Sequence, residues 1–411
     1  MSGRDDPPSV IAPLIAGTLA GAALGAVSGL VPGVHANTMA GLLLSVSPLL
    51  VGTLGTPVLA AALVAALVTH TFLDCVPSTF LGVPDADTAV MVLPAHALCL
   101  EGRASEAVRL SAVGSACAVL WALPLSALFI LLLPSLQPAI DWGIGLILLV
   151  VACYLVVFSE SPSWSAGIFC VSGLLGLFAF RYSYLAWNGG SSVLMPLLSG
   201  LFGVAVLLSA AEGRMPPQER IASLPPVRSL VRTSLAGSAA GAIVGWLPGL
   251  SNAAANAVLA SVIDYGDERR GYIVATSAAN TANAFIGLAA LYAIGRMRNG
   301  VMAALGTLTL PSYPMLLLAG VLAAAVAFGL TLLLSGTAGI FSKMPLRHLN
   351  RIVILFVVVL SFLLCGPFGL FILGAATLIG RVPALVEVRR VSCMGAVMVP
   401  VILSSLGVAV L

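Results

Sequence analysis

Long apolar runs, each bounded by charged residues or proline, recur along this sequence and limit the folds that it can adopt. Roughly 20 apolar residues are needed for one helix to cross the hydrocarbon core of a bilayer, and most of the runs reach that length. Lipid offers no hydrogen-bond partners to open backbone, so the runs are expected to be helical. They fall at residues 10–31, 36–55, 57–81, 108–133, 140–158, 163–185, 191–211, 233–263, 271–294, 300–335, 352–385 and 391–411.

Composition excludes a soluble protein. Of the 411 residues, 60% are hydrophobic and 8% are charged, whereas roughly a quarter of the residues of a soluble domain are charged. The chain has a single lysine, Lys343, and no basic run, which excludes nucleic acid as a partner. We therefore predict an all-α fold, a polytopic bundle of transmembrane helices in the cell membrane, with membrane lipids around it.

A polar stretch divides the chain into two halves. Residues 212–232 contain four prolines and four arginines, and we predict that this stretch is a cytoplasmic hinge loop between membrane halves at 1–211 and 233–411. The positive-inside rule places clusters of arginine and lysine in the cytoplasm. Those clusters lie at 103–109, 214–232, 343–351 and 381–390.

The two halves share a repeated segment. LAGAALGAVSGLVPG at 19–33 matches LAGSAAGAIVGWLPG at 235–249, a shift of 216 residues. Each copy has glycines four apart, which allow close approach of another helix, and each ends in Pro-Gly, which favours a break in the helix. We predict two structural repeats with broken helices that meet near the bilayer midplane in opposite orientation. The alternative is that Pro-Gly only kinks two packing helices.

Polar residues that can cap a restarting helix follow each break. The N-terminus of a half-helix presents free N–H groups and a positive dipole end, which in transporters face anionic solutes. We therefore predict a solute site at the two breaks. Its candidate residues are Pro32, Gly33, His35, Asn37, Thr38, Pro248, Gly249, Ser251, Asn252, Asn256, Asn280 and Asn283.

A second polar stretch follows each break, from Thr69 in the first half and from Thr276 in the second. Polar groups at membrane depth are costly and usually functional. We predict that a coupling ion, Na⁺ or H⁺, binds there, at Asp74, Ser78, Thr79, Asp85 and Asp87. Two alternatives remain: Asp85 and Asp87 can lie on a surface loop, and His70 and His96 can be structural histidines or proton carriers.

Sequence motifs for catalysis are missing. Neither G-x-x-x-x-G-K-[ST] nor H-E-x-x-H occurs, and so few polar residues cannot supply a nucleophile, a base and an acid together. We expect a permease for an anionic solute, not an enzyme, and no cofactor. The competing hypotheses are an intramembrane enzyme, which needs a titratable pair on facing helices, and a passive membrane scaffold, which has no use for duplicated broken helices.

The chain resembles the large membrane subunit family of the tripartite tricarboxylate transporters, in particular its divergent archaeal branch. The resemblance rests on three segments: GLVPGVHANT at 29–38, VPDADTAVMVLPAHALCLEGRASEA at 83–107 and GWLPGLSNAAAN at 245–256. It implies an inverted-repeat carrier that moves di- or tricarboxylates with a cation gradient. In bacteria such a carrier works with a small membrane subunit and a periplasmic solute-binding protein. A homodimer is a further assembly that the sequence allows.

This sequence departs from the bacterial pattern in being shorter and in carrying Asp85-Ala86-Asp87 in place of a glycine- and serine-rich turn. Two acidic groups repel a carboxylate unless a cation neutralises them. Broken helices of this kind also look like those of polyprenyl-phosphate translocases, and a half-helix N-terminus suits phosphate as well. Translocation of an anionic lipid carrier is therefore the alternative function.

Overall fold

The computed structural model describes residues 11–31, 39–40, 43, 47–81, 92–187, 190–209, 216–219, 223–247, 269–337 and 346–408. All regular structure in these ranges is helical, which confirms the predicted all-α bundle. Seven helical segments of the described chain are long and apolar enough to cross a membrane. The helices are α1 (Ile11–Leu30), α3 (Ser47–Leu54), α4 (Thr56–Leu73), α5 (Cys75–Leu81), α6 (Val92–Leu100), α7 (Ala104–Val157), α8 (Pro162–Arg181), α9 (Leu194–Leu198), α10 (Ala205–Ser209), α11 (Val227–Val244), α13 (Arg269–Ile294), α14 (Gly300–Gly306), α15 (Tyr313–Ser335), α17 (Leu346–Leu385) and α18 (Gly395–Ser405).

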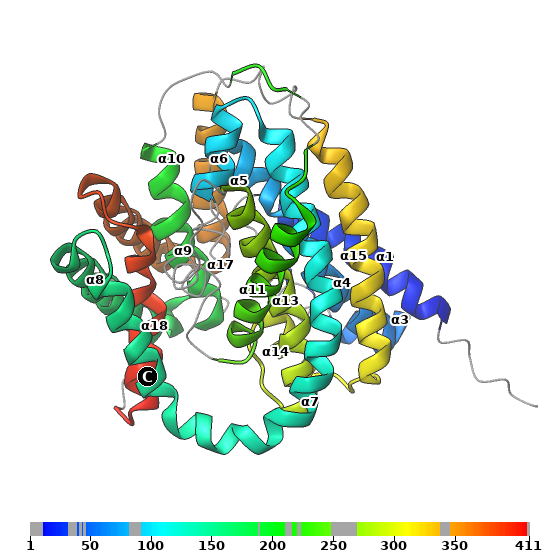
Figure 1. The fold of residues 1–411 in the computed structure, drawn as a ribbon. Coiled ribbons are helices and arrows are strands. Elements are labelled where there is room, and N and C mark those ends of the chain that lie inside the picture. The colour runs from blue at the N-terminus through cyan, green and yellow to red at the C-terminus, as the bar shows by residue number, and fades with distance from the viewer. Residues whose placement is uncertain are drawn as a thin grey trace, which may run out of the picture.

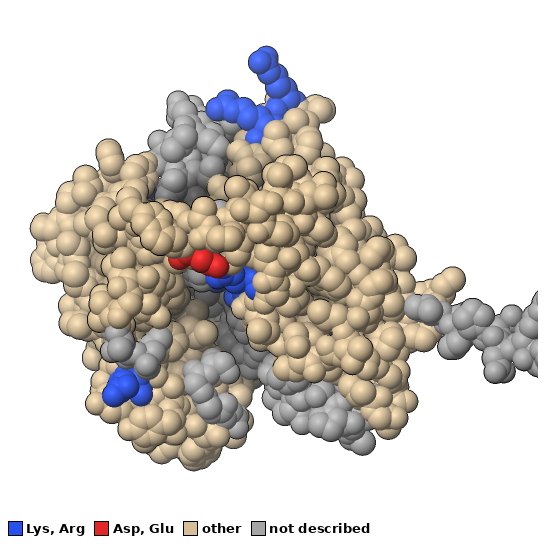
Figure 2. Space-filling model, turned by 90° about the horizontal axis from the view of Figure 1, so that it is seen from below, with Lys and Arg blue, Asp and Glu red and all other residues tan. Residues whose placement is uncertain are grey.

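The helices form two lobes, and each lobe takes helices from both halves of the sequence (Figure 1). The first lobe contains α1, α4, α11, α13 and α15, together with the first part of α7. The second lobe contains α8, α9, α10, α17 and α18, together with the last part of α7. Seen from below, the molecule is hollowed between the lobes, and acidic and basic side chains meet in the hollow (Figure 2).

Helix α7 joins the two lobes along the lower edge of the molecule in Figure 1. It has 54 residues, a length of roughly 80 Å at the rise of an α-helix, so it is far longer than one membrane crossing. Pro124, Pro134 and Pro138 lie inside it. Proline removes a backbone donor and bends a helix, and the two runs that the sequence separates at 108–133 and 140–158 are therefore one bent helix.

Glycines bring α1 into backbone contact with α4. A Cβ on Gly21 would stand 2.2 Å from the carbonyl oxygen of Ala62, and one on Gly25 would stand 2.4 Å from that of Ala66. Only glycine permits such an approach, as expected from glycines spaced four apart. The contacts advance together along both helices, so α1 and α4 run parallel.

Helices α11 and α13 repeat this arrangement. A Cβ on Gly237 would stand 2.0 Å from the carbonyl oxygen of Ala275, and one on Gly241 would stand 2.2 Å from that of Ala279. These two helices are parallel as well. The two glycine-packed pairs are thus similar substructures at the place where the sequence repeats.

The second helix of each pair is offset differently from the first. The alanines that α11 contacts stand 213 residues after those that α1 contacts, so the packing makes Asn283 the counterpart of His70. The alignment of Thr69 with Thr276, suggested by the two polar stretches, is therefore shifted. Helix ends match better: α1 ends at Leu30 and α11 at Val244, each just before its Pro-Gly, as predicted.

Helices α4 and α13 lie at the centre of the first lobe and are almost wholly buried. Val64 and Phe285 both contact Gly320 of α15, and the Thr71 and Thr281 hydroxyls are 3.1 Å apart. Contacts that advance along α4 therefore retreat along α13, so these two helices run antiparallel. This direction supports the inverted relation of the two halves, which stays a prediction.

A second break in the helices was not predicted. Gly366, inside α17, has φ 63° and ψ −154°, so residues 346–365 and 367–385 are separate helices. Positive φ favours glycine, and a Cβ here would stand 2.5 Å from Cε2 of Trp187. The sequence Cys365-Gly366-Pro367 therefore turns the chain within the second lobe.

The arginine-rich end of the first lobe is held by ion pairs. The buried Glu106 carboxylate accepts from Arg103 at 2.8 Å and pairs with Arg270 at 2.5 Å. Part of the predicted hinge packs against this corner: Gln218 bonds the carbonyl oxygen of Cys99 and the backbone N–H of Ala104, each at 3.0 Å. Helix α11 begins at 227, earlier than the expected start of the second half.

We expect Gly241→Ala to destabilise the protein, because the new Cβ cannot stand 2.2 Å from the carbonyl oxygen of Ala279. The expected cost is about 1–3 kcal/mol, as for overpacking, measured as thermal unfolding in detergent. The matched control is Gly167→Ala in α8, where nothing lies within 4 Å. Equal unfolding midpoints for the two variants would contradict the assigned helix contact.

Candidate functional site

The polar residues of the first half gather where α4 gives way to α5. Helix α4 ends at Leu73, and the Asp74 N–H still donates to the carbonyl oxygen of His70 at 3.0 Å. Pro77 has no N–H to continue the ladder to Leu73. Asp74 therefore lies at a discontinuity in the interior of the first lobe, and the Ser78 hydroxyl donates to its carbonyl oxygen at 2.7 Å.

Asp74 is bonded to the second repeat. Asn280 Nδ2 of α13 donates to the Asp74 carboxylate at 2.6 Å, and both residues are 3% exposed. One turn away, the hydroxyls of Thr71 and Thr281 are 3.1 Å apart. These four residues, here called the polar crossing, join the two repeats at their antiparallel contact.

Further polar side chains extend the polar crossing in two directions. Toward α1, the Ser28 hydroxyl is 3.0 Å from Nδ1 of His70. Toward α7, Ser277 donates to the Ser111 hydroxyl at 2.8 Å. An ionised carboxylate inside a lobe costs several kcal/mol unless it is bonded, so these polar contacts are expected around Asp74.

Three buried oxygens near these elements have no hydrogen-bond partner among the described residues: Thr69 Oγ1, Thr79 Oγ1 and Asn283 Oδ1. Thr79 was predicted as an ion ligand, and its carbonyl oxygen is 2.9 Å from Nδ1 of His96. Buried oxygens without partners are unusual in proteins. Such atoms are suited to bind a cation or a donor group of a solute.

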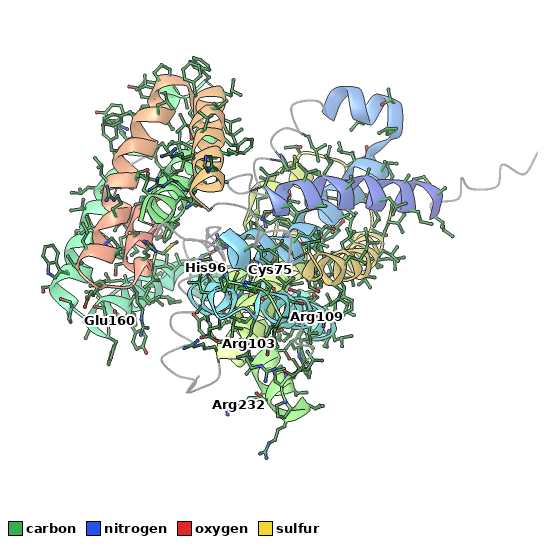
Figure 3. The ribbon with its side chains drawn as sticks, turned by 90° about the horizontal axis from the view of Figure 1, so that it is seen from above. Cys75, His96, Arg103, Arg109, Glu160 and Arg232 are labelled. Carbon is green, nitrogen blue, oxygen red and sulfur yellow. The ribbon has the colours of Figure 1, made fainter. Side chains whose placement is uncertain are left out.

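Both breaks face the second lobe. Leu73, Cys75 and Val76 share an apolar cluster with Met195 and Val204 of that lobe. Seen from above, Cys75 and His96 lie where the two lobes face each other (Figure 3). The site therefore borders the junction of the lobes.

The end of α11 borders the same junction. Val244 and Leu247 belong to an apolar cluster with Leu201 and Ile372 of the second lobe. The carbonyl oxygen of Val244 accepts from Nε of Arg298 at 2.8 Å. Arg298 was missed by sequence reasoning, because it lies 50 residues further along the chain, and only the fold brings it to the second break.

The structure brings together some of the predicted site residues. Asn280, predicted for the solute, bonds Asp74, predicted for the coupling ion. Asn283 lies beside Gly245, near the end of α11. The other predictions fall outside the described residues: Pro32, Gly33, His35, Asn37, Thr38, Asp85, Asp87, Pro248, Gly249, Ser251, Asn252 and Asn256.

We expect Asn280→Ala to lower stability by about 1.5–3 kcal/mol, the usual worth of a hydrogen bond to a charged group. The control is Thr276→Val, whose hydroxyl bonds only within α13, at 2.9 Å to the carbonyl oxygen of Tyr272. Thermal unfolding should also show that Asn280→Ala costs less in an Asp74→Asn background. Additive effects would mean that the two side chains do not act together.

Comparison with known proteins agrees with this architecture. A relative in Methanocaldococcus jannaschii, the uncharacterized protein MJ1079, is 29% identical over 247 residues, which is 59% of this chain and 61% of that protein. The chain thus matches less than two thirds of that relative's length. No solved structure matches the chain significantly. The model of the tripartite tricarboxylate transporter TctA family matches residues 15–395, nearly the whole sequence, and the chain therefore belongs to that family.

Proposed function

We propose that this protein is a secondary-active permease that carries a di- or tricarboxylate across the cell membrane, driven by Na⁺ or H⁺. The observation that carries the proposal is the buried bond between Asp74 and Asn280, which joins the two repeats at the junction of the lobes. Polar residues at such a place mark solute and ion pathways. Membership of the tricarboxylate transporter family supports a carboxylate over a lipid phosphate.

The arrangement suits alternating access. The site borders two lobes that are joined through the bent helix α7, so a relative movement of the lobes can expose it to one side of the membrane and then to the other. Broken helices at a repeat interface hold the solute in carriers that work in this way. Asp74 would bind the cation and the two breaks would bind the anion.

Coupling follows from the charges. A cation at Asp74 favours an anion nearby, and by thermodynamic linkage the anion favours the cation equally. The tripartite family also implies partners, so a small membrane subunit and a solute-binding protein belong to the proposal. A homodimer remains a further proposal.

The first test is the Asp74→Asn variant. Carboxylate affinity of the wild type should rise with Na⁺ concentration or with falling pH, and this dependence should vanish in Asp74→Asn, which keeps the shape of the side chain. Binding is measured on purified protein across a matrix of Na⁺ concentration and pH. Asp141→Asn, on the exposed part of α7, is the matched control.

A wild-type affinity that is independent of both cations would remove the coupling role of Asp74. The panel of ligands should contain di- and tricarboxylates and, for the alternative function, polyprenyl phosphates. Binding of the lipid phosphates alone would replace the carboxylate proposal by lipid translocation.

A second test addresses the breaks. We expect alanine at Asn37 or at Asn252 to abolish uptake in proteoliposomes without loss of expression, because short amides at the break replace the hydration shell of the solute. Asn350→Ala, in α17 of the second lobe, is the control. Unchanged uptake in both site variants would exclude the two asparagines from the site.

A further inference from the structure

We propose that Arg298 binds the anionic group of the solute at the second break, so that the two breaks have opposite charges and different ligands. This inference rests on the proposed transport of an anion and adds a residue and a division of roles to it. The observations that carry it are the position of Arg298, the polarity of the end of α11 and the contrast with Arg296.

The corner after α13 folds back toward the second break. The N–H of Arg296 donates to the carbonyl oxygen of Ala290 at 3.3 Å. A Cβ on Gly287 would stand 3.9 Å from Asn299 Nδ2 and 3.7 Å from the carbonyl oxygen of Gly245. Residues 296–299 therefore lie beside the end of α11, where the Nε bond to Val244 fixes the Arg298 guanidinium.

A cation is needed there for an anion to bind. The last four carbonyls of a helix have no partner within it and carry the negative end of the helix dipole. The end of α11, three residues before Pro248, would therefore repel a carboxylate. The guanidinium on the carbonyl oxygen of Val244 offsets that charge and adds a donor group whose shape matches a carboxylate.

The first break has the opposite polarity. Gly29, near the end of α1, lies against α4 so that its Cβ would stand 3.2 Å from the backbone N of Asp74. Asn280, which bonds Asp74, and Gly287, beside Asn299, are seven residues apart on α13, or roughly 10 Å along the helix. An acid for the cation and a base for the anion are thus held on one helix at neighbouring levels.

Arg296 provides an internal comparison. It belongs to the same corner of the chain as Arg298, but its guanidinium pairs with Asp141 of α7. Its charge is therefore neutralised by the protein, away from the end of α11. Substitution of Arg296 should leave solute binding unchanged.

The test measures affinity for mono-, di- and tricarboxylates in wild type, Arg298→Gln, Arg298→Lys and Arg296→Gln, with thermal unfolding of each. Arg298→Gln should weaken binding of the tricarboxylate at least tenfold and that of a monocarboxylate less. Arg298→Lys should lie between, because it keeps the charge but not the fork of donors. Arg296→Gln should stay within twofold of wild type.

Equal losses for all carboxylates in Arg298→Gln would show that Arg298 only holds the end of α11, and would overturn the inference. Unchanged affinity would overturn it as well. A wild type that binds no carboxylate would instead overturn the proposed function itself.

Should Arg298→Gln fail to fold, Arg298→His supplies the test, because imidazole loses its charge between about pH 5 and 8. Its affinity relative to wild type should then fall as the pH rises through that range. A constant ratio would contradict the proposal.

Discussion

The glycine contacts along α1 and α11 set the geometry on which the rest of the molecule depends. Lipid is as apolar as a leucine side chain, so burial of apolar surface gives little drive for helices to associate within a bilayer, and close packing must do so. Glycine lets the backbone of α1 touch that of α4, and the backbone of α11 touch that of α13. These contacts fix the register and the rotation of each pair.

That register decides which polar groups meet. Because Gly29 lies against the end of α4, Ser28 reaches His70, and the chain arrives at Pro32 close to Asp74. Because Gly245 lies against Ile286, the chain arrives at Pro248 beside the corner that carries Arg298. The same packing device thus leads each repeat to a charged residue, with opposite sign in the two repeats.

The polar crossing has a cost that suggests its purpose. Asp74 and Asn280 are buried at the meeting of α4 and α13, where apolar side chains of similar volume would pack without desolvating a carboxylate. Both breaks also border the second lobe, which combines helices from before and after the hinge. A charged, bonded site at the junction of two lobes is what a carrier needs, and a scaffold does not.

The sequence by itself determined the membrane class, the helical content, the ends of α1 and α11 at Pro-Gly, and the glycine spacing that packs them. Each of these properties is local, since it depends on apolar length, on the missing donor of proline or on the spacing of small residues along one helix. Asp74 could be singled out for the same reason, as an acid in an apolar run. The family resemblance, read from three short segments, was confirmed by the match to nearly the whole chain.

Only the tertiary structure decided which distant residues meet. The bond from Asn280 to Asp74, the pairing of His70 with Ser28, the approach of Arg298 to Val244 and the two-lobed arrangement depend on how helices rotate and cross. Spacing along the chain carries no such information, as the shifted counterpart of His70 shows. The break at Gly366 escaped prediction because an apolar run with one Gly-Pro looks like a single long span until its backbone dihedrals are known.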